Sequence, residues 1–144
     1  MFISKLFFLR KLKSFDVCQQ MLNMFYQSVM ASVLFYACVC WGGNVSKHDA
    51  GRFDKLVKKA SSVVGLSLDT LLVTVERRIV RKTCSIMALQ THPLHSLFTA
   101  QRSSFSGRLV APRCSTERFR RSFLPHAVRL YNERRGHFDE EICQ

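Results

Sequence analysis

The chain has 144 residues, which is enough for one domain with a modest core. Hydrophobic residues make up 47% of it and charged residues 22%, which excludes wholesale disorder, and its 6 Gly and 3 Pro are few for the many turns of an all-β protein. Its 22 Lys and Arg exceed its 10 Asp and Glu, so that the formal net charge is +12. Such an excess is typical of proteins with a polyanionic partner, either nucleic acid or an anionic membrane surface.

The first 44 residues predict two helices. Apolar and basic residues interleave over residues 1–13, as in a short amphipathic helix. Ser14 is expected to cap a long second helix that runs to about Cys40. We expect Met21, Met24 and Met30 to fill the core, and Gly42-Gly43 to end this helix in the left-handed conformation. The second half of the helix is apolar on all sides, which predicts burial between neighbours. The residues expected on the core-facing side are Val17, Met21, Met24, Phe25, Val29, Val33, Tyr36 and Cys40.

Three further helices are expected before residue 100. Ser46 or Asp49 begins one that ends at Gly65, with an apolar stripe formed by Phe53, Leu56, Val57, Ala60 and Val64. Ser67 or Asp69 caps the next, which reaches about Gln90 and turns inward Leu72, Val75, Ile79, Thr83, Ile86 and Met87. Pro93, at a first helical position, permits a short helix through Leu97 and Phe98.

The composition changes near Gln101. Only Glu117 and Glu133 oppose the arginines up to residue 135, which are Arg102, Arg108, Arg113, Arg118, Arg120, Arg121, Arg129, Arg134 and Arg135. Pro125 is expected to open a last short helix carrying Ala127, Val128, Leu130 and Tyr131. The predicted fold is therefore mainly α. It has four or five helices in a small bundle over 1–100, an arginine-rich and partly irregular segment over 101–135 with a short last helix, and a frayed acidic tail over 136–144.

No residue pattern predicts a metal or catalytic site. His92 and His95 lie three residues apart near Cys84, but no second ligand pair completes a zinc site, so these histidines are expected to cap turns or pack at interfaces. The sequence contains neither a G-x-S-x-G nucleophile motif nor a phosphate-binding glycine loop. We therefore expect no enzyme activity, no cofactor and no metal. The six cysteines form no C-x-x-C pair, which favours reduced thiols and an intracellular protein, nuclear or cytoplasmic.

A long apolar run offers a membrane alternative. No charged residue occurs over 17–46, and the dense apolar part, 29–41, has about 13 residues. A membrane-spanning helix needs roughly 20. A helix buried in protein is the simpler reading, and a membrane-associated protein with one inserted helix over about 17–41 is the alternative.

A family resemblance covers most of the chain. It is carried by FLRKLKSFDVCQQMLNMFYQSVMASVLFYACVCWGGN (8–44) and DAGRFDKLVKKASSVVG (49–65), and later by HPLH (92–95), RSSFSGRL (102–109) and CSTERFRRSFLPHAVRLYNE (114–133). The first two runs resemble the segment that follows the polymerase palm in LINE-type, non-LTR retrotransposon reverse transcriptases. The later runs resemble the carboxyl end of the same polyproteins.

The resemblance implies a thumb, the part that grips a template–primer duplex. It therefore implies RNA or an RNA–DNA hybrid as partner, without sequence specificity, and the palm domain as a second partner. The palm, whose carboxylates hold two metal ions, would lie upstream of residue 1. The acidic residues of this chain are isolated or lie in its tail, so the resemblance implies binding without polymerisation. A decayed open reading frame with no cellular role is a further alternative.

A shorter resemblance is limited to FLRKLKSF (8–15). It is similar to a segment associated with the amino-terminal region of AlkB-type tRNA-modifying dioxygenases. Those enzymes hold iron with two His and one carboxylate. His137-Phe138-Asp139 has the H-x-D spacing, but no distant second His follows it, so we expect no dioxygenase activity.

The candidate site is a set of basic residues expected to contact phosphates. Arginine dominates the 101–135 segment, and its planar guanidinium group suits bidentate phosphate contacts. Phe105 and Phe119 lie between these arginines as candidates for base stacking, whereas Phe123 and Tyr131 are expected in a core. The candidate phosphate contacts are Lys11, Lys13, Lys55, Lys58, Lys59, Arg102, Arg108, Arg118, Arg120 and Arg121.

Overall fold

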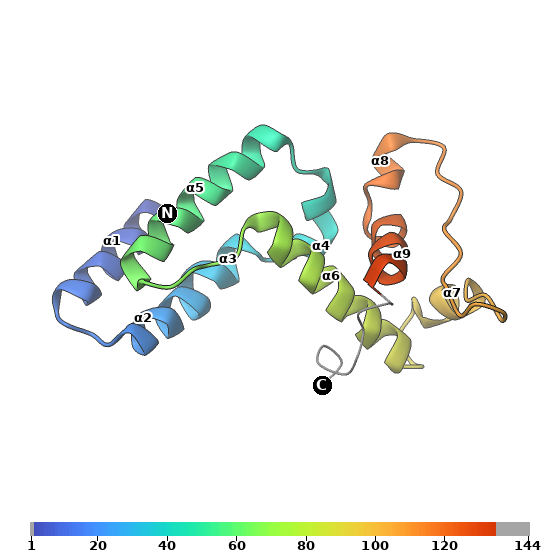
Figure 1. Ribbon diagram of the computed structural model, residues 1–144, viewed down its shortest axis with the longest axis horizontal. Coiled ribbons are helices and arrows are strands. Elements are labelled where there is room, and N and C mark those ends of the chain that lie inside the picture. Colours follow the sequence, from blue (N-terminus) through green and yellow to red (C-terminus); the bar gives the residue numbers. More distant parts are fainter. Residues whose placement is uncertain (1, 135–144) are drawn as a thin grey trace. The chain divides into compact units, whose positions relative to one another are not determined.

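The computed structural model describes residues 2–134 and is mainly α, as predicted (Figure 1). Within that range it holds no strand, and a single β-bridge joins Arg102 to Leu109. The chain divides into two compact units, described separately below. Unit 1 comprises Met1–Cys38 and Val45–Thr74, and unit 2 comprises Val39–Asn44 and Val75–Gln144. Arg135, the acidic tail 136–144 and the His137–Asp139 motif lie outside the described residues.

Helix α1 (Phe2–Ser14) confirms the predicted amino-terminal helix and buries Leu6 and Leu9. The predicted capping role of Ser14 is wrong, because Ser14 lies in the last turn of α1, where its hydroxyl donates a hydrogen bond to the Lys11 carbonyl at 2.7 Å. The chain leaves α1 through Asp16, whose φ is +54°. Aspartate tolerates that left-handed conformation better than most residues do.

The predicted single helix to Cys40 is replaced by several short segments. These are α2 (Gln19–Phe25), a π-helical segment η1 (Tyr26–Ala31), α3 (Ser32–Leu34), α4 (Cys38–Trp41) and the 3-10 turn η2 (Gly42–Asn44). The break between α3 and α4 includes Ala37, which has a φ of +47°. A left-handed residue with a Cβ cannot continue a right-handed helix.

The core-facing side predicted for this region is also wrong. The buried residues are Leu22, Tyr26, Met30, Ala31, Phe35 and Cys38, whereas Met21, Met24, Val33, Tyr36 and Cys40 are exposed. The π-helical segment contributes to the difference, because it changes the number of residues per turn and so shifts which side chains face inward. The expected burial of the second half on all sides fails for the same residues, since Val33 and Tyr36 are 53% and 78% exposed.

Glycines 42 and 43 serve a purpose other than the predicted one, since neither has a positive φ. A Cβ on Gly42 would lie 2.6 Å from a methyl group of Val75, and one on Gly43 would overlap the carbonyl oxygen of Arg121. The absence of a side chain therefore permits close packing within unit 2.

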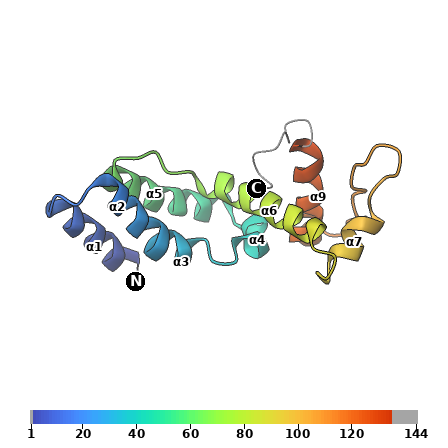
Figure 2. The same cartoon turned by 90° about the horizontal axis from the view of Figure 1, so that it is seen from below.

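Helix α5 (Lys47–Val64) confirms its prediction at both ends. The Ser46 hydroxyl oxygen accepts a hydrogen bond from the Asp49 backbone N–H at 3.1 Å, and Gly65 ends the helix with a φ of +77°. Val57, Ala60 and Val64 of the predicted stripe are buried, together with Val63. Within unit 1, α1, α2 and α5 contact one another, as Figures 1 and 2 show.

Helix α6 (Leu71–Ala88) begins two residues after Asp69, the later of the two predicted capping residues, and ends two residues before the predicted Gln90. At its start, the Leu71 backbone N–H donates to the Asp54 carboxylate at 2.9 Å. The predicted inward residues Val75, Ile79, Thr83 and Ile86 are buried, but Leu72 is 62% exposed and contradicts its prediction.

The rest of unit 2 alternates short helices with irregular chain. Helix α7 (His95–Ala100) begins two residues after Pro93, and Phe98 is buried in it. Irregular chain over 101–116 leads to α8 (Glu117–Arg120) and then to α9 (Phe123–Arg134), which confirms the predicted last helix. Ala127, Val128 and Leu130 of α9 are buried, as predicted, whereas Phe123 and Tyr131 are only half-buried.

The apolar run also bears on the membrane alternative. No single helix in residues 2–134 combines the length and apolar composition of a membrane span. One broken pair, formed by Gln19–Leu34 and Cys38–Asn44, passes that test when its two parts are taken together.

Candidate nucleic-acid interface

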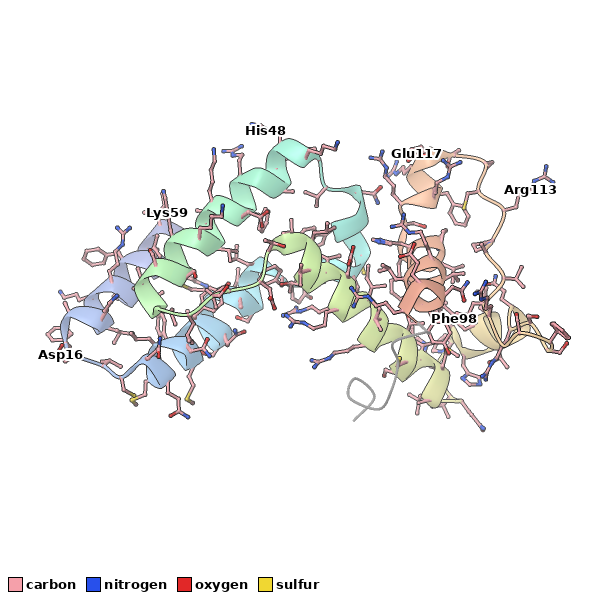
Figure 3. All side chains as sticks on the ribbon, viewed as in Figure 1. Asp16, His48, Lys59, Phe98, Arg113 and Glu117 are labelled. Carbon is pink, nitrogen blue, oxygen red and sulfur yellow. The ribbon has the colours of Figure 1, made fainter. Side chains whose placement is uncertain are left out.

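Helix α5 carries a row of exposed lysines on the side opposite its core-facing stripe. Lys55, Lys58 and Lys59 lie within little more than one turn, because side chains three and four residues apart share a helix face. All three are exposed, and none forms an ion pair in the described part of the chain. Figure 3 labels Lys59 among them. We call these three residues the α5 lysine face. Its ammonium groups are available to an anionic partner.

Helix α1 brings a further lysine to this region. The Lys13 ammonium donates a hydrogen bond to the Ser62 carbonyl of α5 at 3.4 Å. Ser62 follows Lys58 and Lys59 by one helical turn, so Lys13 lies beside the carboxyl-terminal end of the α5 lysine face. Lys11 is exposed on the same helix α1. The structure therefore brings together Lys13, Lys58 and Lys59 from segments more than forty residues apart.

The carboxylates of α5 are engaged elsewhere. The Asp49 carboxylate accepts a hydrogen bond from the Ser46 hydroxyl at 2.8 Å. This bond above all holds the pKa of Asp49 below its ordinary value; desolvation opposes it, and His48 and Arg52 add smaller contributions in the lowering direction. Asp54 accepts the Leu71 N–H. Both aspartates thus support helix starts, and neither forms an ion pair with the lysine face.

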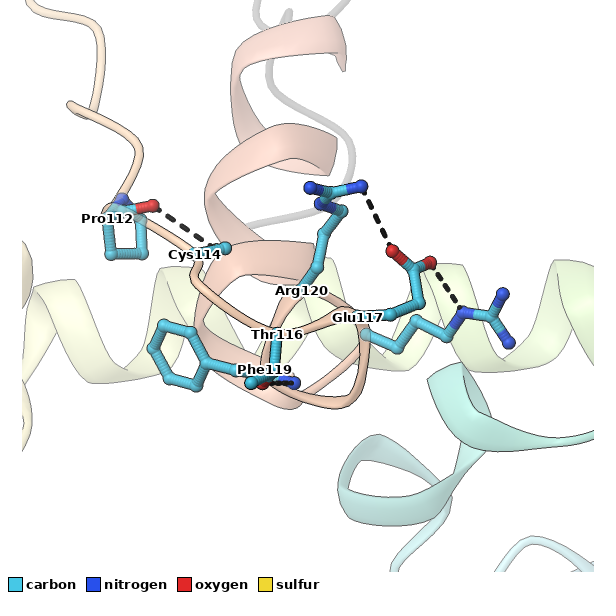
Figure 4. A network of polar contacts seen from close by, with 7 residues as sticks. Pro112, Cys114, Thr116, Glu117, Phe119 and Arg120 are labelled. Atoms are coloured by element: carbon cyan, nitrogen blue, oxygen red, sulfur yellow. Dashed lines mark hydrogen bonds and ion pairs between the residues drawn. The ribbon is translucent and has the colours of Figure 1, made fainter.

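The candidate arginines all lie in unit 2, and two of them pair with one carboxylate. Glu117 accepts from Arg120 Nη1 and from Arg121 Nε, both at 3.0 Å (Figure 4). These are exposed pairs at spacings of three and four residues, and such pairs contribute little to stability. One negative charge therefore partly neutralises Arg120 and Arg121, whereas Arg118 is exposed on α8 without an ion pair in the described region.

Arg102 and Arg108 occupy the two sides of one loop. The Ser103 N–H donates to the Arg108 carbonyl at 2.8 Å, which brings the two sides together next to the Arg102–Leu109 bridge. Both arginines are exposed. Phe105 lies between them in the sequence and is fully exposed, while Phe119 is 38% exposed.

The ten candidate residues thus fall into two groups of five. Lys11, Lys13 and the α5 lysine face belong to unit 1, and the five arginines belong to unit 2. The candidate list omits two exposed basic residues next to these groups, Arg52 on α5 and Arg113 before α8. Helix spacing could have predicted Arg52 on the same side of α5 as the lysines, since it precedes Lys55 by three residues and Lys59 by seven.

His92 and His95, which the sequence does not support as zinc ligands, have other partners in the structure. His92 Nδ1 accepts the Leu94 N–H at 3.1 Å. His95 Nδ1 lies 3.1 Å from the Ile86 carbonyl, to which it donates in the tautomer that carries the hydrogen on Nδ1. Both observations agree with the predicted capping and packing roles. Within residues 2–134, no three His, Cys, Asp or Glu side chains gather as metal ligands would.

Comparison with known proteins adds no relative: no protein-family model, no curated protein and no solved structure matches this chain.

Proposed function

We propose that this chain is a non-catalytic nucleic-acid-binding protein that grips phosphate backbones without reading sequence. The single observation that carries the proposal is the α5 lysine face, three exposed ammonium groups without a paired carboxylate, with Lys13 beside it. Phosphate neutralisation by such groups releases counterions and needs no special geometry. The resemblance to a reverse-transcriptase thumb, which would close on a duplex, points to the same chemistry.

The expected partner is an RNA–DNA hybrid or RNA. The α5 lysine face extends about 6 Å along the helix axis from Lys55 to Lys59, at 1.5 Å per residue. A face of this length can contact neighbouring phosphates of one strand. Helix α5 presents its lysines on one side and buries Val57, Ala60 and Val64 on the other, so binding would leave the core intact.

The test replaces the lysine face as a unit. Lys55→Gln, Lys58→Gln and Lys59→Gln, made together, keep residues that favour helix while removing three charges. We expect weaker binding of a labelled RNA–DNA hybrid in fluorescence anisotropy at low salt. The slope of log K against log salt concentration should become shallower by about 2 to 3, because each phosphate contact contributes about 0.7 to 0.9.

A control variant removes the same charge elsewhere. Lys47, Arg81 and Lys82 are exposed, and changing all three to Gln lowers the net charge equally. This control should keep most of the salt slope. Equal losses in the two variants would indicate attraction by net charge alone, and wild-type protein that fails to bind at low salt would refute the proposal.

Membrane association is the second candidate. The observation that favours it is the exposure of apolar side chains in the 17–41 region, among them Met21, Met24, Val33 and Tyr36, together with the broken pair that passes the span test. Alkaline carbonate washing of membranes from expressing cells separates the two functions. An inserted 17–41 segment would keep the chain in the pellet, whereas a nucleic-acid-binding protein would be released.

A further inference from the structure

The 102–109 loop is closed by backbone hydrogen bonds at its base. The antiparallel bridge between Arg102 and Leu109 is flanked by two of them. The Val110 N–H donates to the Gln101 carbonyl at 2.7 Å, and the Ser103 N–H donates to the Arg108 carbonyl at 2.8 Å. This is the hydrogen-bond pattern of a short antiparallel hairpin.

The turn inside the loop is fixed as well. The Gly107 N–H donates to the Ser103 carbonyl at 2.8 Å, and Gly107 has a φ of +62°, which glycine adopts without steric cost. The Ser106 N–H donates to the Ser103 hydroxyl oxygen at 3.3 Å, and the Arg108 N–H donates to that of Ser106 at 3.4 Å. The sequence Ser-Ser-Phe-Ser-Gly therefore folds into one defined turn with Phe105 in its middle.

One asparagine anchors the loop to α9. The Asn132 side-chain oxygen accepts from the Leu109 N–H at 3.0 Å, and its amide nitrogen donates to the Leu109 carbonyl at 2.8 Å. Leu109 itself is only 2% exposed. The base of the loop is thus held both by a buried side chain and by two hydrogen bonds to a helix.

This defined loop presents a phenyl ring entirely to solvent. Phe105 has a relative exposure of 101%, the largest among the exposed large hydrophobic side chains in the described part of the chain. An exposed phenyl ring contributes nothing to a folded core, and the fixed turn holds this one where a partner can reach it. A flat aromatic surface is suited to stacking on another flat ring.

The surrounding charge indicates which ring that is. Arg102 and Arg108 are both exposed on the two sides of the loop, and neither forms an ion pair within the described residues. Cations beside an exposed aromatic ring complement a nucleotide, in which a planar base is joined to an anionic phosphate. In a duplex the faces of the bases are covered by their neighbours, whereas an unpaired base can stack on a side chain.

We propose that the 102–109 loop binds an unpaired nucleotide of single-stranded RNA or DNA. Phe105 stacks on the base, while Arg102 and Arg108 hold the adjoining phosphates. This inference rests on the proposed nucleic-acid binding and adds a site, separate from the α5 lysine face, with a preference for single strands.

The experiment uses the full chain and two probes, a labelled oligouridylate of about a dozen nucleotides and a hybrid duplex of similar length. Phe105→Leu removes the aromatic ring but keeps an apolar side chain, and Phe105→Trp keeps an aromatic surface. Phe15→Leu is the matched control, because Phe15 is also exposed but belongs to unit 1. Since Phe105 makes no core contact, these variants leave the fold unchanged, which circular dichroism verifies.

We expect Phe105→Leu to weaken oligouridylate binding by about tenfold, as the loss of one base–aromatic stack would, and to change duplex binding by less than about twofold. Phe105→Trp should restore binding, and its fluorescence should change when oligouridylate is added, beyond the change of Trp41 in the wild-type chain. Phe15→Leu should bind like wild type.

Two results would overturn the inference while leaving the proposed function in place. In the first, Phe105→Leu binds oligouridylate as tightly as wild type, although binding still depends on the α5 lysine face. In the second, Phe105→Leu weakens single-strand and duplex binding equally, which indicates a contact other than stacking. Wild-type protein that binds neither probe at low salt would remove both proposals.

Discussion

His126 illustrates how burial sets the chemistry of one residue. Its imidazole lies in α9 and is nearly buried. Burial disfavours the charged imidazolium and lowers the pKa of His126 below the ordinary 6.5, and the positive charge of Arg129 acts in the same direction. Glu76 and Glu133 partly oppose this shift. Because the lowering prevails, folding favours the neutral imidazole.

The sign of the resulting pH dependence follows from proton binding. As the pH falls through 6.5, the unfolded state takes up a proton at His126 before the folded state does. The free energy of unfolding should therefore fall with the pH, starting near 6.5 and levelling off below the lowered folded-state pKa. Urea denaturation of wild type and His126→Gln between about pH 7.5 and pH 5 measures this decline in the free energy of unfolding. The variant should show a shallower decline, and parallel curves would contradict the assignment.

At the same scale, the sequence predicts which side chains are charged and exposed but not how they pair. The α5 lysines follow from helix spacing, and all three are exposed. The pairing of Arg120 and Arg121 with Glu117 obeys the familiar spacings of three and four residues, yet it depends on the short helix α8, which no apolar periodicity indicates. The exposure of Phe105 depends on the turn around it, and an isolated phenylalanine in a sequence is as compatible with a core.

Among the helices, the accuracy of prediction follows the strength of local signals. Helix α5 has a capping serine, an amphipathic stripe and a terminal glycine, and each signal specifies the same boundaries. The 17–41 region is flanked by Ser14 and Gly42-Gly43, but Ser14 lies in the last turn of α1, neither glycine has a positive φ, and the apolar residues between them occur on every side. Its periodicity therefore cannot select a face, and the π-helical segment and the break at Ala37 are settled by packing rather than by local preference.

Two glycines in different elements should respond oppositely to the same substitution. Gly51 lies in α5 with open space where its Cβ would be, so Gly51→Ala should raise the free energy of unfolding by about 0.5 to 1 kcal/mol through helix propensity. Gly43→Ala should lower it by about 1 to 3 kcal/mol, because its Cβ would overlap the Arg121 carbonyl and approach His126 Nδ1 at 3.1 Å.

Urea denaturation midpoints, compared at equal slope, measure both glycine effects. The two variants control for one another, since each adds one methyl group. A stabilising Gly43→Ala would show that η2 does not pack as described.

On the scale of the whole molecule, the positive charge is shared by both units. Unit 1 contains nine Lys and Arg against four Asp, and unit 2 contains thirteen against six acidic residues. Neither unit therefore neutralises itself, and the few ion pairs of the described residues are mostly exposed, such as Arg129 with Glu133 at 3.8 Å. Repulsion among like charges outweighs the attraction within exposed pairs, because the latter are individually worth less than about 1 kcal/mol.

This imbalance predicts a stability that rises with ionic strength. Salt shortens the Debye length from about 30 Å at 10 mM to about 8 Å at 150 mM, so it screens repulsion between distant lysines and arginines more than it weakens close pairs. The Tm followed by circular dichroism should therefore rise by roughly a few degrees over that range.

A polyanionic RNA should raise the Tm at low salt by binding the folded chain and lose this effect at high salt. The triple Lys→Gln variant of the α5 lysine face has less repulsion, so its Tm should rise less with salt alone. A wild-type Tm that falls with salt would show that the exposed ion pairs, not the net charge, govern stability.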